Sequence, residues 1–293
     1  MSNFTKRIIS SSIALPVTFI LLYLGGPYFL AYAMVVMILS TYELNHVLSD
    51  ADTSRGFKSI CFLIIPILLS LAAYRGPIEL YLSFAILCLL GVGFELAKKS
   101  TTKEVFFKGW IFRAAYPGLL LSHVILIREL DLSGVPSLLG SINLDETGLF
   151  LLILILLCTF TNDTAAYIVG KLIGSNKIAP ILSPRKTMEG TIGGVLASCG
   201  MAVLVNYLFG AVIEHVWVII WGLLIGSMTF LGDLFESKLK RQAGVKDSGN
   251  IIPGHGGILD RIDGLLFAIP SSYYALLIYF MYKGLGFKEI LEL

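Results

Sequence analysis

Residues 148–169 read GLFLLILILLCTFTNDTAAYIV, an apolar run that ends in a polar segment. As an α-helix, a stretch of this length rises about 33 Å, which matches the ~30 Å hydrocarbon core of a bilayer. The run therefore predicts a membrane-spanning helix. Its polar end, residues 161–167, places Asp163 and Tyr167 on one helical face, and an ionisable residue in a spanning helix usually has a function. The alternative is that the helix simply ends at the membrane interface.

The composition extends this interpretation to the whole chain. Hydrophobic residues make up 56% of the 293 positions and charged residues 14%, against roughly 25% charged in soluble domains. We expect one membrane domain over residues 1–293, with N-terminal helices (1–150) as a lipid-facing or dimer scaffold and catalytic helices and cytoplasmic loops in 151–293. The net charge of +2 is too small to indicate a nucleic-acid partner. The four cysteines lie in apolar runs without a CxxC pair, so neither disulfides nor zinc are implied.

Apolar runs separated by turn and charge signals predict an all-α, polytopic membrane fold with about nine spanning helices. We place them at 8–24, 28–48, 58–73, 78–97, 110–127, 148–169, 191–212, 216–236 and 264–283. Lys and Arg concentrate in the connections on the side of the N-terminus, which predicts a cytoplasmic N-terminus and an outside C-terminus. The polar segments at 170–190 and 237–263 then face the cytoplasm.

The densest polar segment covers residues 232–263, GDLFESKLKRQAGVKDSGNIIPGHGGILDRID. On a helix, Asp233, Ser237 and Lys240 have i, i+4, i+7 spacing and share one face. A carboxylate, a hydroxyl and an ammonium group together suit a metal–phosphate site, because Mg²⁺ is commonly held by one or two carboxylates plus substrate phosphates.

Downstream, residues 253–257 read PGHGG and lead into a helix that we expect to begin near Ile258. Such a loop can bring backbone N–H groups close to a phosphate, although a flexible turn is an equally good interpretation. Asp260, Arg261 and Asp263 follow in the first turns of that helix. They predict a cation site, and the alternative is acidic residues that merely complement the helix dipole.

Other charged residues give weaker signals. Residues 183–190 read SPRKTMEG, in which Ser183, Arg185 and Lys186 can grip a polyphosphate from a turn. Arg113, within the fifth span, either contacts a lipid phosphate or snorkels to the interface. The remaining ionisable residues near span ends receive no catalytic role: Glu43, His46, Glu95 and His123.

Two of these motifs carry a family resemblance. Ser237-x-Leu239-Lys240-Arg241-x4-Lys246-Asp247 and Pro253-x-His255-Gly256-Gly257-Ile258-x-Asp260-Arg261-Ile262-Asp263 resemble the signature of phosphatidate cytidylyltransferases. The polar blocks around Asp163 and Ser183–Gly190 are also similar to that family. The resemblance covers about residues 160–265, whereas the first 150 residues resemble only generic apolar spans.

The resemblance implies that a phosphatidate oxygen attacks the α-phosphorus of CTP, giving CDP-diacylglycerol and pyrophosphate. It implies Mg²⁺, with a possible second cation, a homodimer, and an active site on the cytoplasmic face of the cell membrane. The expected metal ligands are Asp233, Asp260, Asp263 and Asp163. The expected catalytic residues are Asp233, Asp260, Lys240 and His255, the last protonating or only binding the leaving group. The expected substrate-binding residues are Ser183, Arg185, Lys186, Ser237, Arg241, Lys246, Asp247, Gly256, Gly257 and Arg261.

Other functions stay open at this point. A CTP-dependent enzyme acting on another lipid, such as a CDP-archaeol synthase or a polyprenol kinase, would share the apolar half. A transporter would need interrupted helices in both halves of the chain, whereas the charges here gather in the second half. A non-catalytic scaffold fits poorly with a complete set of acidic and basic residues.

Overall fold

The computed structural model of the chain describes residues 3–48, 55–97, 111–130, 147–254 and 256–286. Each of the nine predicted segments lies mostly within a helix. Six of the described helices are long and apolar enough to cross a membrane: Gly26–Val47, Ile111–Arg128, Thr147–Leu172, Met188–Leu208, His215–Gln242 and Leu259–Tyr282. Three shorter apolar helices are Ile9–Leu24, Leu63–Arg75 and Pro77–Gly93. The helical membrane fold is thus confirmed, while nine crossings and the orientation of the termini stay predictions.

The chain packs into two compact units, Met1–Leu126 with Gln242–Ile262, and Ile127–Arg241 with Asp263–Leu293. Residues Gln242–Ile262, which we call the glycine-rich segment, belong to the first unit with the N-terminal helices. The predicted division of the chain into 1–150 and 151–293 stays a prediction. The first unit contains α1 (Asn3–Leu24), α2 (Gly26–Val47), α3 (Arg55–Arg75), α4 (Pro77–Ala97), the π-helix η1 (Ala114–Leu119) and α10 (Leu259–Ile262). The helix α6 (Leu120–Arg128) leads from the first unit into the second.

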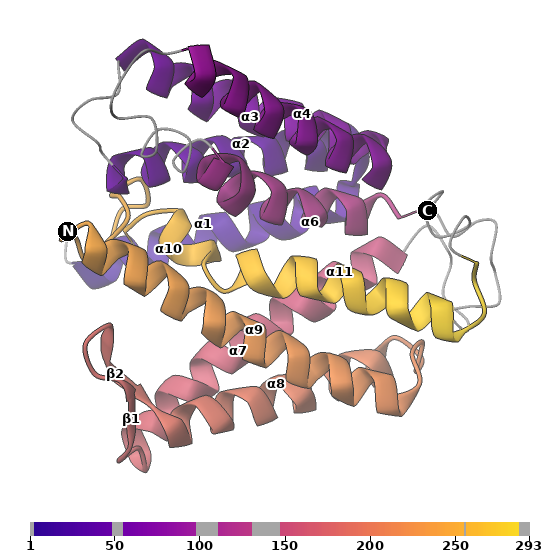
Figure 1. Cartoon of the computed structure of the whole chain (residues 1–293). Coiled ribbons are helices and arrows are strands. Elements are labelled where there is room, and N and C mark those ends of the chain that lie inside the picture. The colour runs from indigo at the N-terminus through magenta and orange to yellow at the C-terminus, as the bar shows by residue number, and fades with distance from the viewer. Residues whose placement is uncertain (1–2, 49–54, 98–110, 131–146, 255, 287–293) are drawn as a thin grey trace. The chain divides into compact units, whose positions relative to one another are not determined.

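The second unit contains α7 (Thr147–Leu172), α8 (Met188–Leu208), α9 (His215–Gln242) and α11 (Leu265–Tyr282). An antiparallel ribbon of β1 (Lys177–Ala179) and β2 (Ser183–Thr187) connects α7 to α8 (Figure 1). This ribbon is a local departure from the all-helical prediction, which treated residues 183–190 as a turn. Pairing of Lys177 with Thr187 and of Ala179 with Ser183 makes the segment extended.

The predicted ninth helix is broken near its start. We expected Asp260, Arg261 and Asp263 in continuous helical turns, but α10 ends at Ile262 and α11 begins at Leu265. The Asp263 carboxylate accepts a hydrogen bond from the Gly264 N–H at 2.7 Å, which competes with helical pairing. Gly232 of α9 packs directly against the Asp263 carbonyl, where a Cβ would clash. The break therefore lets α9 approach the Asp263 backbone.

Small residues let α7, α8 and α9 pack closely. A Cβ on Gly194 would lie 2.8 Å from the Asn162 carbonyl oxygen of α7. A Cβ on Gly226 would lie 2.9 Å from Val195 Cα and 3.0 Å from Ser198 Cβ, both in α8. Close backbone approach through small residues is the usual way that helices associate within a membrane.

A side-chain contact also connects the start of α9 to the end of α11. Lys283, just after α11, donates a hydrogen bond to Glu214, just before α9. This hydrogen bond raises the pKa of Lys283. Because both groups are substantially exposed, we attribute to the pair only a small share of the stability.

We predict that Gly226→Ala lowers the stability of the protein by about 1–3 kcal/mol, because the added methyl group overpacks the contact between α8 and α9. The measurement is thermal unfolding in detergent. Gly200→Ala is the matched control, since nothing lies within 4 Å of a Cβ at that helical position. Equal unfolding temperatures for the two variants would contradict the packing argument.

Candidate active site

An ion pair joins the β-ribbon to α9. Lys186 Nζ of β2 lies 2.6 Å from Asp233 Oδ2 and 5.1 Å from the centre of the Phe230 ring. The other carboxylate oxygen, Asp233 Oδ1, accepts a hydrogen bond from Ser237 Oγ at 3.3 Å. The predicted face of Asp233 and Ser237 is thus present, and Lys186 is added to it from a segment 47 residues earlier in the chain.

Local contacts explain why Lys186 is held in place. Thr187 caps α8, since its Oγ1 accepts a hydrogen bond from Gly190 N at 3.2 Å. The Glu189 carboxylate accepts hydrogen bonds from the backbone and side chains of Ser175 and Asn176, at 2.7–3.3 Å. These contacts fix both ends of the ribbon and hence the strand that carries Lys186.

A second acid–base pair lies one turn further along α9. Glu236 is 1% exposed and accepts a hydrogen bond from Lys240. The sequence predicted a role for Lys240 but assigned none to Glu236. The i, i+4 spacing of the two residues was the available signal, but it is common on solvated helices and does not reveal burial.

Four carboxylates gather in the second unit, and we call Asp163, Asp233, Glu236 and Asp263 the carboxylate cluster. Asp263 interacts electrostatically with the other three. Asp163, on α7, is exposed and accepts a hydrogen bond from Asn162 Nδ2 at 3.3 Å. Asp263 therefore interacts with both other predicted metal ligands of this unit, Asp163 and Asp233.

Two carboxylates of the cluster form ion pairs with lysines. Asp233 is paired with the ammonium group of Lys186, and Glu236 with that of Lys240. Excess charge of one sign at a membrane protein's helix ends is unfavourable unless a counter-ion or substrate compensates for it. Within the described residues, no three His, Cys, Asp or Glu side chains converge tightly enough to form a ready-made metal site.

The glycine-rich segment of the first unit is organised by Asp260. Asp260 Oδ2 accepts hydrogen bonds from the N–H groups of Ser248 and Gly257, each at 2.9 Å. Gly256 has φ +86°, and its carbonyl accepts a hydrogen bond from the Ile252 N–H at 2.9 Å. The N–H of Gly257 is therefore used within the loop, and the loop's shape depends on the Asp260 carboxylate.

The N-terminal helices also hold this loop. Arg7 Nε donates to the Gly254 carbonyl at 2.8 Å, and Ser10 Oγ donates to the Pro253 carbonyl at 3.3 Å. From α2, the buried Glu43 accepts hydrogen bonds from Leu259 N and Ser248 Oγ. Local sequence patterns predicted no catalytic role for Glu43, because its partners lie more than 200 residues away.

Comparison with known proteins identifies the family. The chain matches the family model described as "Cytidylyltransferase family" over residues 5–279. It is 34% identical over 284 residues to a Synechocystis protein named Phosphatidate cytidylyltransferase, covering 92% of this chain and 95% of that protein. Proteins of the same name from Thermotoga maritima and Bacillus subtilis are 31% and 37% identical, over 93% and 67% of this chain and 96% and 67% of their own length.

The chain belongs to the cytidylyltransferase family. It is therefore an enzyme that transfers a nucleotidyl group, and the predicted resemblance is confirmed. The match extends through the N-terminal helices, where the sequence showed only generic apolar spans.

The other predicted site residues of this cytidylyltransferase lie on β2, near the end of α9, in the loop after α9, and on α10. Ser183 begins β2, and Arg185 is exposed on that strand. Four predicted residues in or beside the polar segment are exposed: Arg241, Lys246, Asp247 and Arg261. His255 lies outside the described residues. The individual roles of all these residues stay predictions.

Arg113 behaves differently from a snorkelling arginine. The residue is 6% exposed, and its Nε donates a hydrogen bond to Asn45 Oδ1 of α2. A snorkelling side chain would instead reach the interface with its charged group. Arg113 thus connects the segment before η1 to the end of α2, two residues from Glu43.

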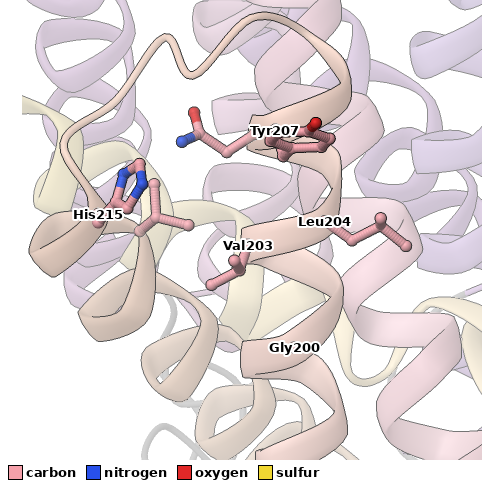
Figure 2. Close-up of a pocket in the computed structure, with 7 residues that line it drawn as sticks. Gly200, Val203, Leu204, Tyr207 and His215 are labelled. Atoms are coloured by element: carbon pink, nitrogen blue, oxygen red, sulfur yellow. The ribbon is translucent and has the colours of Figure 1, made fainter.

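A pocket lies at the far end of α8 and α9 from the carboxylate cluster (Figure 2). Its lining residues are Gly200, Val203, Leu204, Asn206, Tyr207, His215 and Val218. Val218 and Asp233 are fifteen residues apart on α9, which is about 22 Å along a helix. None of the predicted site residues lines this pocket, so its geometry does not support a role in nucleotide transfer.

We predict that Lys186→Met lowers kcat for nucleotide transfer by about 10²–10³-fold, the effect of removing one charge-stabilising group from a reaction centre. Lys177→Met is the matched control, because Lys177 is an exposed lysine on the neighbouring strand. Steady-state rates of both variants in detergent provide the measurement. Similar losses in both variants would show that the ribbon needs only positive charge and not the pair with Asp233.

Proposed function

We propose that this cytidylyltransferase transfers CMP from CTP to phosphatidic acid, giving CDP-diacylglycerol and pyrophosphate, at the cytoplasmic face of the cell membrane. The observation that carries the proposal is the match to relatives named Phosphatidate cytidylyltransferase along more than 90% of both chains. The side chains support it, because paired acids and bases surround Asp233 in a helical membrane protein.

The proposed reaction needs no protein base to create a nucleophile. The phosphate monoester of phosphatidic acid is already anionic at neutral pH, so its oxygen can attack the α-phosphorus of CTP directly. The bond from the α-phosphorus to the bridging oxygen breaks, and pyrophosphate leaves with that oxygen. The protein then has to position two anions and to compensate their charge, which is how phosphoryl-transfer enzymes generally act.

Lys186 and Lys240 are placed for that task. Each ammonium group is held by a carboxylate of α9, Lys186 by Asp233 and Lys240 by Glu236. A lysine fixed in this way loses little further rotamer freedom when a phosphate arrives, and an ammonium group can donate three hydrogen bonds. We propose that both lysines bind the triphosphate, with exposed Arg185 and Arg241 as additional contacts.

The carboxylate cluster fits Mg²⁺ by its charge and by its donor atoms. Carboxylate oxygens are the hard ligands that Mg²⁺ prefers, and the ion keeps several waters or substrate oxygens, so a complete protein shell is unnecessary. We propose Asp163, Asp233 and Asp263 as ligands in the second unit, and Asp260 as a metal ligand in the first unit. When bound, the ion would neutralise phosphate charge and align an in-line displacement.

Two further features of the proposal rest on the sequence and the resemblance. The bias of Lys and Arg supports a cytoplasmic N-terminus and an outside C-terminus, and with them a cytoplasmic site. The family resemblance supports a homodimer, which the mass of the detergent-solubilised protein would test.

We expect label from α-³²P-CTP to enter a chloroform-extractable product only when phosphatidic acid and a divalent cation are both present. The measurement is partition of the label after incubation with the purified protein in detergent. Label transferred from γ-³²P-CTP to a lipid alcohol would instead identify a lipid kinase. Label transferred to a different phospholipid acceptor, but not to phosphatidic acid, would overturn the proposed substrate.

A pair of substitutions at Asp260 separates metal binding from loop organisation. Asp260→Asn keeps a carbonyl oxygen that can accept from Ser248 N and Gly257 N, but it removes the charge. If Asp260 is a metal ligand, Asp260→Asn should lower activity by about 10²-fold or more and raise the Mg²⁺ concentration needed for half-maximal rate. Full activity in Asp260→Asn together with a defect in Asp260→Ala would restrict the residue to holding the loop.

A further inference from the structure

Glu43 is a buried acidic residue that the proposed mechanism does not use. It lies near the end of α2, in the N-terminal half where the sequence shows no catalytic motif, and it is 1% exposed. A carboxylate at such a position is unfavourable unless several hydrogen bonds compensate for its desolvation. Its partners therefore indicate why it is there.

The Glu43 carboxylate is bound to both ends of the glycine-rich segment. Its Oε2 accepts a hydrogen bond from the Leu259 N–H at 2.8 Å and from Ser248 Oγ at 3.2 Å. Leu259 and Ser248 are 11 residues apart and flank the PGHGG turn. The Glu43 Oε2 atom of α2 thus holds the two ends of this loop together.

Two glycines of the segment lie so close to the Glu43 side chain that a Cβ would not fit. A Cβ on Gly249 would lie 2.5 Å from Glu43 Oε1, and a Cβ on Gly257 would lie 2.5 Å from Glu43 Oε2. Side chains at either position would push the loop away from α2. The absence of side chains at Gly249 and Gly257 therefore serves the contact with Glu43.

Ser248 connects Glu43 to Asp260. Ser248 is 4% exposed, its hydroxyl donates to Glu43, and its N–H donates to Asp260 Oδ2 at 2.9 Å. The Leu259 N–H, bonded to Glu43, belongs to the residue immediately before Asp260. Any displacement of Glu43 would consequently shift the backbone on which Asp260 is carried.

We propose that Glu43 is a positioning residue, which fixes the segment 246–261 so that Lys246, Asp260 and Arg261 can meet the nucleotide substrate. This inference rests on the proposed function, because those three residues are assigned to CTP or its cation. The action of Glu43 is indirect: its Oε2 accepts both hydrogen bonds from the loop itself, and hydrogen bonds to a carboxylate are among the stronger ones in proteins.

The test compares Glu43→Ala with Glu43→Gln. Alanine removes both hydrogen bonds, whereas glutamine retains an acceptor oxygen of nearly the same geometry. We expect Glu43→Ala to lower kcat/KM for CTP by about 10-fold or more, with KM for phosphatidic acid changed by less than about 2-fold. Glu43→Gln should stay within about 3-fold of the wild type. Thr41→Val is the matched control, since Thr41 is equally buried on α2 but donates only to the Met37 carbonyl.

Hydrogen–deuterium exchange provides a readout that does not depend on activity. Peptides covering 246–262 should exchange faster in Glu43→Ala than in the wild type, and not in Glu43→Gln or Thr41→Val. Should Glu43→Ala fail to fold, Ser248→Ala removes one of the two bonds and should show the same changes at a smaller size.

Three outcomes would overturn the inference. In the first, Glu43→Ala and Thr41→Val lose activity equally, which means a general packing defect. In the second, exchange rises but kcat/KM for CTP does not change. In the third, Glu43→Gln is as inactive as Glu43→Ala with normal exchange, which means that the charge acts directly. Absence of CMP transfer by the wild type would instead contradict the proposed function, and exchange would still show whether Glu43 holds the loop.

Discussion

The ion pair between Lys186 and Asp233 is the interaction on which the second unit's polar site depends. An apolar helical protein has few ways to keep charges at helix ends, because each one needs a partner or water. Lys186 reaches Asp233 only because the β-ribbon is fixed by the Thr187 cap and by Glu189. The pair keeps an ammonium group beside the Asp233 carboxylate.

Close packing of α7, α8 and α9 brings acidic residues of the second unit near one another. Asn162 and Gly194 bring α7 against α8, and Gly226 brings α9 against α8, so that acidic residues from α7 and α9 interact with Asp263. Bulkier side chains at these glycines would separate the helices and weaken those interactions. Two carboxylates of α9, Asp233 and Glu236, are in turn paired with Lys186 and Lys240.

In the first unit, carboxylates stabilise a loop by accepting hydrogen bonds from it, whereas in the second unit they pair with lysines. Asp260 and Glu43 each accept two hydrogen bonds from the glycine-rich segment. Glycines give that segment close access to α2 but also a large conformational entropy, so its shape must be imposed by such contacts. A segment held in this way can present charged side chains with little further ordering when substrate binds.

The sequence by itself determined the helical membrane fold, the family and the shared face of Asp233 and Ser237, because apolar runs, the signature and i+4 spacing are local patterns. It did not predict the β-ribbon, the break at Asp263, or the buried contacts of Glu236 and Glu43. Those features depend on burial and on partners far apart in the chain, such as the 205 residues between Glu43 and Ser248. Only the tertiary structure brings such residues together, since a single acidic residue near a helix end has the same local pattern whether it is buried against a loop or exposed to water.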